Sequence, residues 1–271
     1  MGGKKPHLSP TQLDMYARCP EAYRRRYIEK EIIPPGFAML RGTGVHAGAE
    51  HNFNQKIESR EDLPAADIIG AAVAGFEEAV AGGYSLTDDE AEKNAKDVIG
   101  EQKDVVVDMA TLHADEQAPD YQPVAVEQYV RLELPNHSRD LVGVIDLMDD
   151  QDRVIDFKTA GRKKSQTDAD TSTQLTVYAA AHKRLTGRDA KEVRLDTVVK
   201  TKKSTSRDVV SSTRGAADFD ALANRVNVIT HAIESGTFTP ATPGTWWCSQ
   251  KFCGYWDTCP FVNSEREEKS K

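Results

Sequence analysis

Two carboxylates and a lysine within residues 141–158 are the side chains best placed to do chemistry. The segment predicts two strands joined by an acidic turn, with Asp146 near the end of the first strand and Asp156 in the second. If the turn is centred near Gln151, the two carboxylates lie opposite each other, with Cβ atoms roughly 5 Å apart. Lys158 follows Asp156 by two residues, so both side chains point to the same face of the sheet.

Like charges placed in this way repel each other unless a cation lies between them. Mg²⁺ prefers oxygen ligands and typically binds one or two carboxylates together with a substrate phosphate. A lysine beside such an ion can stabilise negative charge that develops on a phosphate. The arrangement therefore indicates a metal-dependent phosphodiesterase. The alternative is a solvated polar turn, because Asp-Asp-Gln-Asp is also ordinary turn chemistry.

Two further segments offer polar side chains on predicted helices. His46 lies in the sequence RGTGVHAGAE, where a glycine-containing turn is expected to open a helix near Thr43. Gln174 and Tyr178 are four residues apart at the start of the helix that follows the hairpin, so they share one face of it. The structural alternative is a packed or surface histidine and a half-buried tyrosine on a polar helix edge.

The order of these residues, His, then Asp, then D-x-K, then Q-x-x-x-Y, resembles the PD-(D/E)XK nuclease superfamily and specifically its RecB-like branch. The resemblance implies a site for Mg²⁺ or Mn²⁺ built from His46, Asp146 and Asp156, with the carbonyl of Phe157 as a further ligand. It also implies that Lys158 positions or activates the attacking water and stabilises the transition state.

The same resemblance assigns roles to residues around this centre. Gln174 and Tyr178 match an additional motif of the RecB-like branch, which contacts the DNA backbone near the scissile phosphate. Ile145 stands before Asp146 where the superfamily's name has proline, at a position that varies widely among its members. Glu127, on the preceding predicted strand, is a further candidate carboxylate that we rank below the others.

Four cysteines form a second group: Cys19 near the start, and Cys248, Cys253 and Cys259 in a C-x4-C-x5-C pattern near the end. Four thiolates can hold an iron–sulfur cluster or a tetrahedral zinc ion. The same residues could instead form two disulfides or remain as four buried thiols without a metal. Zinc ribbons usually carry two C-x2-C pairs, which this spacing lacks.

One remote cysteine, a terminal triplet and the Cys19-Pro20 step resemble the cluster-bearing RecB-like nucleases, including AddB and the CRISPR-associated RecB-like exonucleases. The resemblance implies a [4Fe–4S] cluster on Cys19, Cys248, Cys253 and Cys259, with Zn²⁺ as the alternative. A cross-link between positions so far apart in the chain stabilises a fold by about 4–5 kcal/mol in the loop-entropy treatment.

The charge balance limits how the chain can hold nucleic acid. It has 35 basic and 43 acidic residues, a formal net charge of -8, which argues against coating DNA by bulk electrostatics. The charge balance still allows local contacts between basic side chains and DNA phosphates. The best placed basic residues directly follow the D-x-K strand: Arg162, Lys163 and Lys164. Weaker candidates are the runs at 24–26 and 200–203.

The pattern of elements predicts an α/β fold with a restriction-endonuclease-like core, a mixed central sheet with flanking helices. An N-terminal helical region and a C-terminal Cys-rich segment are added to it. We expect one RecB-like nuclease domain over 1–262, with a helical part at about 8–120, a catalytic core at about 121–240 and a cluster-binding end at 241–262. A helix is expected from a capping box at Ser9 to about residue 30, and a disordered tail over 263–271.

The predicted function is a Mg²⁺- or Mn²⁺-dependent DNA exonuclease that prefers single-stranded ends, in recombination, repair, phage replication or CRISPR spacer capture. No phosphate-cradling G-x-x-x-x-G-K-[ST] motif is present, so a separate helicase, recombination or CRISPR protein would supply single strands. No apolar stretch approaches a membrane span and no secretory leader is evident, which favours the cytoplasm. The alternative is a cluster-stabilised DNA-binding subunit of a larger complex with little intrinsic catalysis.

Overall fold

The computed structural model describes residues 5–134 and 137–262. The strands are β1 His7–Leu8, β2 Pro123–Leu132, β3 Asp140–Asp149, β4 Arg153–Ala160, β5 Glu192–Lys200 and β6 Thr205–Ser212. The α-helices are α1 Pro10–Arg18, α2 Pro20–Tyr23, α3 Phe37–Ser59, α4 Ala65–Ala81, α5 Asp88–Ala91, α6 Ala95–Leu112, α7 Gln166–Asp170, α8 Thr173–Thr186 and α9 Ala216–Glu234. The predicted tail at 263–271 lies outside the described residues.

A six-stranded mixed sheet forms the centre of the molecule, in the order β1-β3-β4-β5-β6, with β2 also paired to β3. The β2–β3, β3–β4 and β5–β6 pairs are antiparallel, whereas β4 and β5 are parallel and are joined through α7 and α8. This arrangement confirms the predicted α/β class, the β3–β4 hairpin and the crossover helix.

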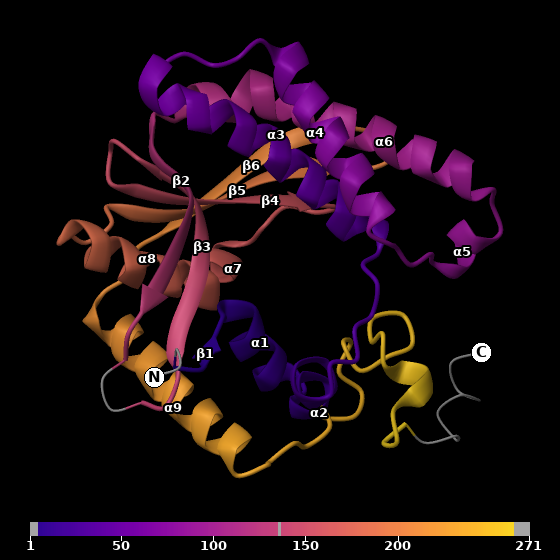
Figure 1. Ribbon diagram of the computed structural model, residues 1–271, viewed down its shortest axis with the longest axis vertical. Helices are drawn as coiled ribbons and strands as arrows, with labels where there is room; N and C mark the ends of the chain where they lie inside the picture. Colours follow the sequence, from indigo (N-terminus) through magenta and orange to yellow (C-terminus); the bar gives the residue numbers. More distant parts are fainter. Residues whose placement is uncertain (1–4, 135–136, 263–271) are drawn as a thin grey trace.

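Helices cover both faces of the sheet (Figure 1). On one face, α3 packs against β2 and β4 and α6 against β5 and β6, with α4 behind α3. On the other face, α8 lies across the strands and α9 packs on α8. Phe53 of α3 stacks on Phe157 of β4, with ring centroids 5.5 Å apart, so α3 is held firmly against the hairpin.

Helix α3 differs from its prediction, because it begins at Phe37 and its glycines lie within the helix, not in a turn that opens it. A Cβ atom at Gly44 would lie 2.7 Å from the carbonyl oxygen of Ala72, and one at Gly48 would lie 2.7 Å from that of Ile68. The glycines therefore allow α3 and α4 to approach closely, and this packing sets the position of the helix.

The N-terminal helix starts as predicted but is interrupted. Ser9 accepts a hydrogen bond from the backbone of Gln12 and the Gln12 side chain reciprocates, which confirms the capping box. The expected single helix to about residue 30 was wrong. The helix ends at Arg18 and α2 begins at Pro20, because proline disfavours helical backbone in Cys19, which is extended with φ −155°.

Within the described residues, none of the helices has the length and apolar character needed to cross a membrane.

Candidate metal centre

Three neighbouring strands bring three carboxylates into a row. The registers of β2 with β3 and of β3 with β4 place Asp146 opposite Glu127 on one side and Asp156 on the other. The β3–β4 register is centred on residue 151, as the sequence predicts. The β3–β4 ladder ends one pair before the two aspartates, where the Asp146 carboxylate accepts the backbone N–H of Phe157 at 2.8 Å. The two strands diverge here and leave space for a site.

His46 approaches this row from α3. Its Nδ1 lies 3.8 Å from Oδ2 of Asp146 and 3.9 Å from Oε1 of Glu127. One ligand atom from each of these three residues lies within 4.8 Å of the other two. His46 Nε2 is 3.0 Å from the carbonyl oxygen of Phe157, to which it can donate, and this bond holds the ring with Nδ1 toward the carboxylates.

The three residues that converge differ in one member from the predicted ligand set. We ranked Glu127 below the others from the sequence, whereas the structure places it with His46 and Asp146. The predicted ligand Asp156 is fully buried beside them and bound to Lys158. Phe157 faces His46 through its carbonyl. The ligand roles of Asp156 and of the Phe157 carbonyl stay predictions.

Glu127 has an irregular backbone. Its φ is +45°, in the left-handed region that residues with a side chain seldom adopt. Such conformations persist where the surrounding structure imposes them, and they are common at functional sites. Regular strand patterning gives no signal for this feature. Whether Glu127 is a ligand stays a prediction, which its place beside His46 and Asp146 favours.

The electrostatics of the site favour a bound cation. Burial, reinforced by the charge of Asp156, raises the pKa of Asp146 to about 7. Burial alone would lower the pKa of His46, but Glu127 and Asp146 outweigh it and raise that pKa. The charged form of Asp146 is thus destabilised by its surroundings, and a hard divalent ion would stabilise it.

A chain of polar contacts runs from Asp156 to α8. The Nζ of Lys158 lies 2.8 Å from Asp156 and donates to Oε1 of Gln174 at 3.2 Å, and Nε2 of Gln174 donates to the hydroxyl of Tyr178 at 2.6 Å. Burial opposes the charged form of Lys158, but Asp156 and Asp146 outweigh it and raise its pKa. Lys158 is therefore a fixed positive charge, held in one orientation.

The tyrosine at the end of this chain rests on a glycine of β3. A Cβ atom at Gly143 would lie 3.0 Å from Cε1 of Tyr178, so the absence of a side chain at 143 is what lets the ring lie there. Burial raises the pKa of Tyr178, which keeps its hydroxyl protonated. Gln174 and Tyr178 thus form the pair that their four-residue spacing predicts.

Lys158 lies between two cavities. One, on the α3 side, is lined by His46, Glu127 and Glu50, and the other, on the α1 and α8 side, by Gln174, Lys164, Arg18 and Trp247. Lys158 lines both. Arg18 and Trp247 did not emerge from the sequence, because they lie far from the D-x-K strand along the chain and only the fold brings them to it.

The three basic residues predicted to contact DNA have different surroundings in the structure. Lys164 lines the cavity beside Lys158, whereas the side chains of Arg162 and Lys163 are 76% and 71% exposed and lie near Asp168 and Asp208, respectively. Their contact with DNA stays a prediction.

The earlier basic run is different, because Arg25 is buried. It pairs with Glu31 at 2.7 Å and donates to Thr258, so it cannot meet a phosphate as the run at 24–26 suggested. It instead fastens the C-terminal segment to the N-terminal helices.

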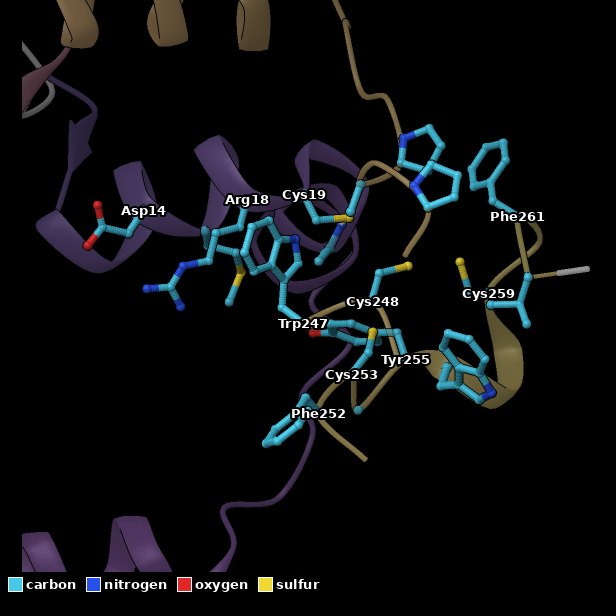
Figure 2. A pocket seen from close by; sticks show the side chains of 18 of the residues that line it. Asp14, Arg18, Cys19, Trp247, Cys248, Phe252, Cys253, Tyr255, Cys259 and Phe261 are labelled. Atoms are coloured by element: carbon cyan, nitrogen blue, oxygen red, sulfur yellow. Dashed lines mark hydrogen bonds between the residues drawn. The ribbon is translucent and has the colours of Figure 1, made fainter. Parts of the chain in front are cut away.

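The four cysteines surround one cavity of about 390 Å³ between α1–α2 and the C-terminal segment (Figure 2). No disulfide joins Cys19, Cys248, Cys253 or Cys259. Among the described residues, no three of the four sulfur atoms lie within 4.8 Å of one another. Burial raises the pKa of the Cys253 thiol, and the other three cysteines raise it further.

Comparison with known proteins identifies the family. The family model described as the PD-(D/E)XK nuclease superfamily matches residues 7–260. The chain belongs to this superfamily. No curated protein sequence matches it.

Comparison with solved structures gives two similar chains. A "putative exonuclease" from Eubacterium rectale is 14% identical, with a TM-score of 0.50 over 96% of this chain and 90% of that one. SSO0001 is also 14% identical, with a TM-score of 0.41 over 96% of this chain and 88% of that one. At this identity, the likeness to the Eubacterium rectale protein supports the fold.

Proposed function

We propose that this member of the nuclease superfamily is a divalent-metal-dependent deoxyribonuclease that degrades DNA from single-stranded ends. The observation that carries the proposal is the convergence of His46, Glu127 and Asp146 beside the charged Lys158. Action at ends and on single strands rests on the resemblance to the RecB-like branch, which the family match does not resolve. The same resemblance favours a cytoplasmic protein.

The donor set fits Mg²⁺ or Mn²⁺. A histidine nitrogen and carboxylate oxygens lie within 4.8 Å of one another, with a carboxylate that burial destabilises in its charged form. His46, Glu127 and Asp146 would hold the ion, with Asp156 adjoining. When bound, such an ion polarises a phosphate and lowers the pKa of water.

The protein's own side chains supply the remaining functions. Lys158 is held in place by Asp156 and Gln174. It donates hydrogen bonds to the phosphate, and its positive charge stabilises the negative charge that develops on the phosphate during the reaction. Tyr178 accepts from Gln174 and keeps its own O–H to donate to the DNA backbone. His46 and the backbone of Phe157 hold the carboxylate row in place.

Replacing Lys158 with alanine tests the proposal. With Mg²⁺ or Mn²⁺ and end-labelled single- and double-stranded oligonucleotides, we expect hydrolysis by Lys158→Ala to fall at least about 100-fold, while DNA affinity changes only a few-fold. Lys93→Ala, which removes an exposed lysine that pairs with Glu101, is the control and should cut normally.

The product lengths separate the two functional hypotheses. A ladder that begins at one end supports an exonuclease and gives its polarity. A wild-type protein that binds DNA but is inert with both ions would favour the DNA-binding subunit instead.

For the cysteines we propose a [4Fe–4S] cluster, with zinc as the alternative. Four thiolates on one zinc ion lie about 3.8 Å apart, given Zn–S bonds of about 2.3 Å in a tetrahedron. The four thiols line one cavity of about 390 Å³, which has room for a group larger than a single zinc ion. The four ligands would tie the N-terminal helices to the C-terminal segment.

Metal analysis of anaerobically purified protein tests this assignment. We expect about four iron atoms per chain and an absorption band at about 400 nm, both of which Cys253→Ala should remove. A colourless protein with one zinc per chain would contradict the cluster.

A further inference from the structure

Three aromatic residues of the C-terminal segment form a cluster at the surface. Trp246 makes edge-to-face contacts with Trp247 and Phe252, with ring centroids 5.5 and 5.1 Å apart. Trp246 is 61% exposed and Phe252 is 55% exposed. In Figure 2, the ring of Phe252 points away from the cysteines. Single exposed apolar side chains are ordinary, but a contiguous aromatic group indicates a binding surface.

The cluster is continuous with the candidate nuclease site. Trp247 lines the cysteine cavity and also the cavity that contains Asp156 and Lys158. Arg18 lines both of the same cavities, and Lys164 lines the second. A ligand that reaches from the aromatic rings to Lys158 therefore passes the positive side chains of Arg18 and Lys164, although Asp14 and Asp168 line the same cavities.

Packing explains only part of this arrangement. Trp247 is half-buried and closes the side of the cysteine cavity, so it has a structural role. Trp246 and Phe252 leave more than half of their surface in water, and Lys251 lies over the Phe252 ring with Nζ 5.5 Å from its centroid. Exposed rings accompanied by cations match the chemistry of a nucleobase surface better than that of a protein core.

We propose that Trp246 and Phe252 form a stacking surface for unpaired bases of a single DNA strand, whose backbone runs past Arg18 and Lys164 to Lys158. This inference rests on the proposed nuclease function and assigns it a substrate subsite. Aromatic rings can stack on a base only when the base is unpaired or flipped out, so the surface selects single strands. It also explains how a chain with net charge -8 holds DNA, since stacking needs no excess of positive charge.

Two oligonucleotide probes separate stacking from backbone attraction. One is a fluorescein-labelled oligo-dT, and the other has the same length and label but abasic sites throughout. Without divalent ions, anisotropy should show that Trp246→Ala binds oligo-dT about tenfold more weakly than the wild type. Its affinity for the abasic strand should be unchanged, because only the bases stack.

Three further variants make the test specific. Phe252→Ala should also weaken binding of oligo-dT selectively, and Trp246→Phe should restore most of the affinity because it keeps a ring. Val228→Ala removes an apolar side chain that is 61% exposed on α9, outside the two cavities, and should bind both strands normally.

The outcomes distinguish this inference from the proposed function. Equal weakening on both probes, or no weakening on either, would overturn the stacking surface. Because binding is measured without hydrolysis, selective weakening on oligo-dT supports the subsite even if the Lys158→Ala assay shows no catalytic role. Loss of cutting by Lys158→Ala together with unchanged binding by Trp246→Ala would sink the subsite alone.

Discussion

At the scale of single residues, Asp146 illustrates how the site is built. Its carboxylate takes the place of a ladder bond by accepting the N–H of Phe157, and it also faces His46. One side chain thus ends the β3–β4 pairing and supplies a candidate ligand. A change at Asp146 would disturb both, so Glu127 is the better residue with which to test the metal centre.

Glu127→Gln should weaken Mn²⁺ binding by about 10- to 100-fold, because it removes a carboxylate from the three-residue group while keeping its shape. Calorimetric titration of the DNA-free protein with Mn²⁺ measures this. Glu50→Gln is the matched control, since Glu50 lines the same cavity but lies outside the group. Equal affinities for the two variants would exclude Glu127 as a ligand.

The residues that the sequence could predict are those on regular backbone. Period-two geometry placed Asp156 and Lys158 on one face, and the four-residue spacing paired Gln174 with Tyr178. The sequence offered Glu127 only as a lower-ranked candidate, and its positive φ and its convergence with His46 and Asp146 are visible only in the fold. Sequence spacing predicts which side chains share a face only where the strand or helix is regular.

At the scale of elements, the strands and the crossover helix were predicted correctly from the sequence, but the start of α3 was not. Glycine is a poor helix former, so its recurrence between 42 and 48 suggested a turn. Contact with α4 overrides that preference, since both Gly44 and Gly48 face backbone carbonyls of α4 at distances that exclude a side chain. Only knowledge of the partner helix would have revealed this.

Gly48→Ala should therefore destabilise the protein by about 1–3 kcal/mol, although alanine favours helices, because its Cβ would meet the carbonyl oxygen of Ile68. Gly70→Ala, in α4 with nothing within 4 Å of the new Cβ, should stabilise it by about 0.5–1 kcal/mol. Urea unfolding measures both. The same sign for the two substitutions would refute the close approach of α3 and α4.

At the scale of the whole molecule, polar contacts that do not involve the cysteines join the N-terminal helices to the C-terminal segment. Arg25 pairs with Glu31, and the hydroxyl of Tyr255 donates to the carbonyl oxygen of Glu31 at 2.8 Å. Arg25 also lies over the Tyr255 ring, 4.8 Å from its centroid. From the cysteines, the sequence predicted that the N-terminal helices and the C-terminal segment lie together. It could not show that Arg25 is buried between them, because its position in a basic run gives no sign of burial.

His113 should make the folded protein less stable in mild acid, in opposition to Asp146, whose raised pKa makes stability rise as the pH falls over the same range. Burial lowers its pKa to about 4, and its Nδ1 donates to Oε1 of Gln117 at 2.9 Å. Below about pH 6.5 the unfolded chain takes up a proton that the folded protein rejects, so the contribution of His113 to stability decreases as the pH falls from 6.5 toward 4. The full loss is about 3 kcal/mol, and above pH 6.5 His113 contributes no pH dependence.

Urea unfolding at several pH values checks this, with His113→Phe as the comparison. The variant should lose about 1 kcal/mol near pH 8, where a hydrogen bond is missing, and this difference from the wild type should shrink and then reverse as the pH falls below 6.5. A difference that stays constant with pH would show that His113 does not contribute to the pH dependence.

The contact between Gly143 and Tyr178 has a consequence for how such enzymes lose activity. A methyl group at 143 would require the phenol ring to shift by a few tenths of an ångström, and Gln174 links that ring to Lys158. We therefore expect a substitution at this uncharged strand position to disturb the proposed site while every acidic residue and the lysine remain in the sequence. A classification that infers activity only from the presence of the acidic residues and the lysine would not detect a relative inactivated in this way.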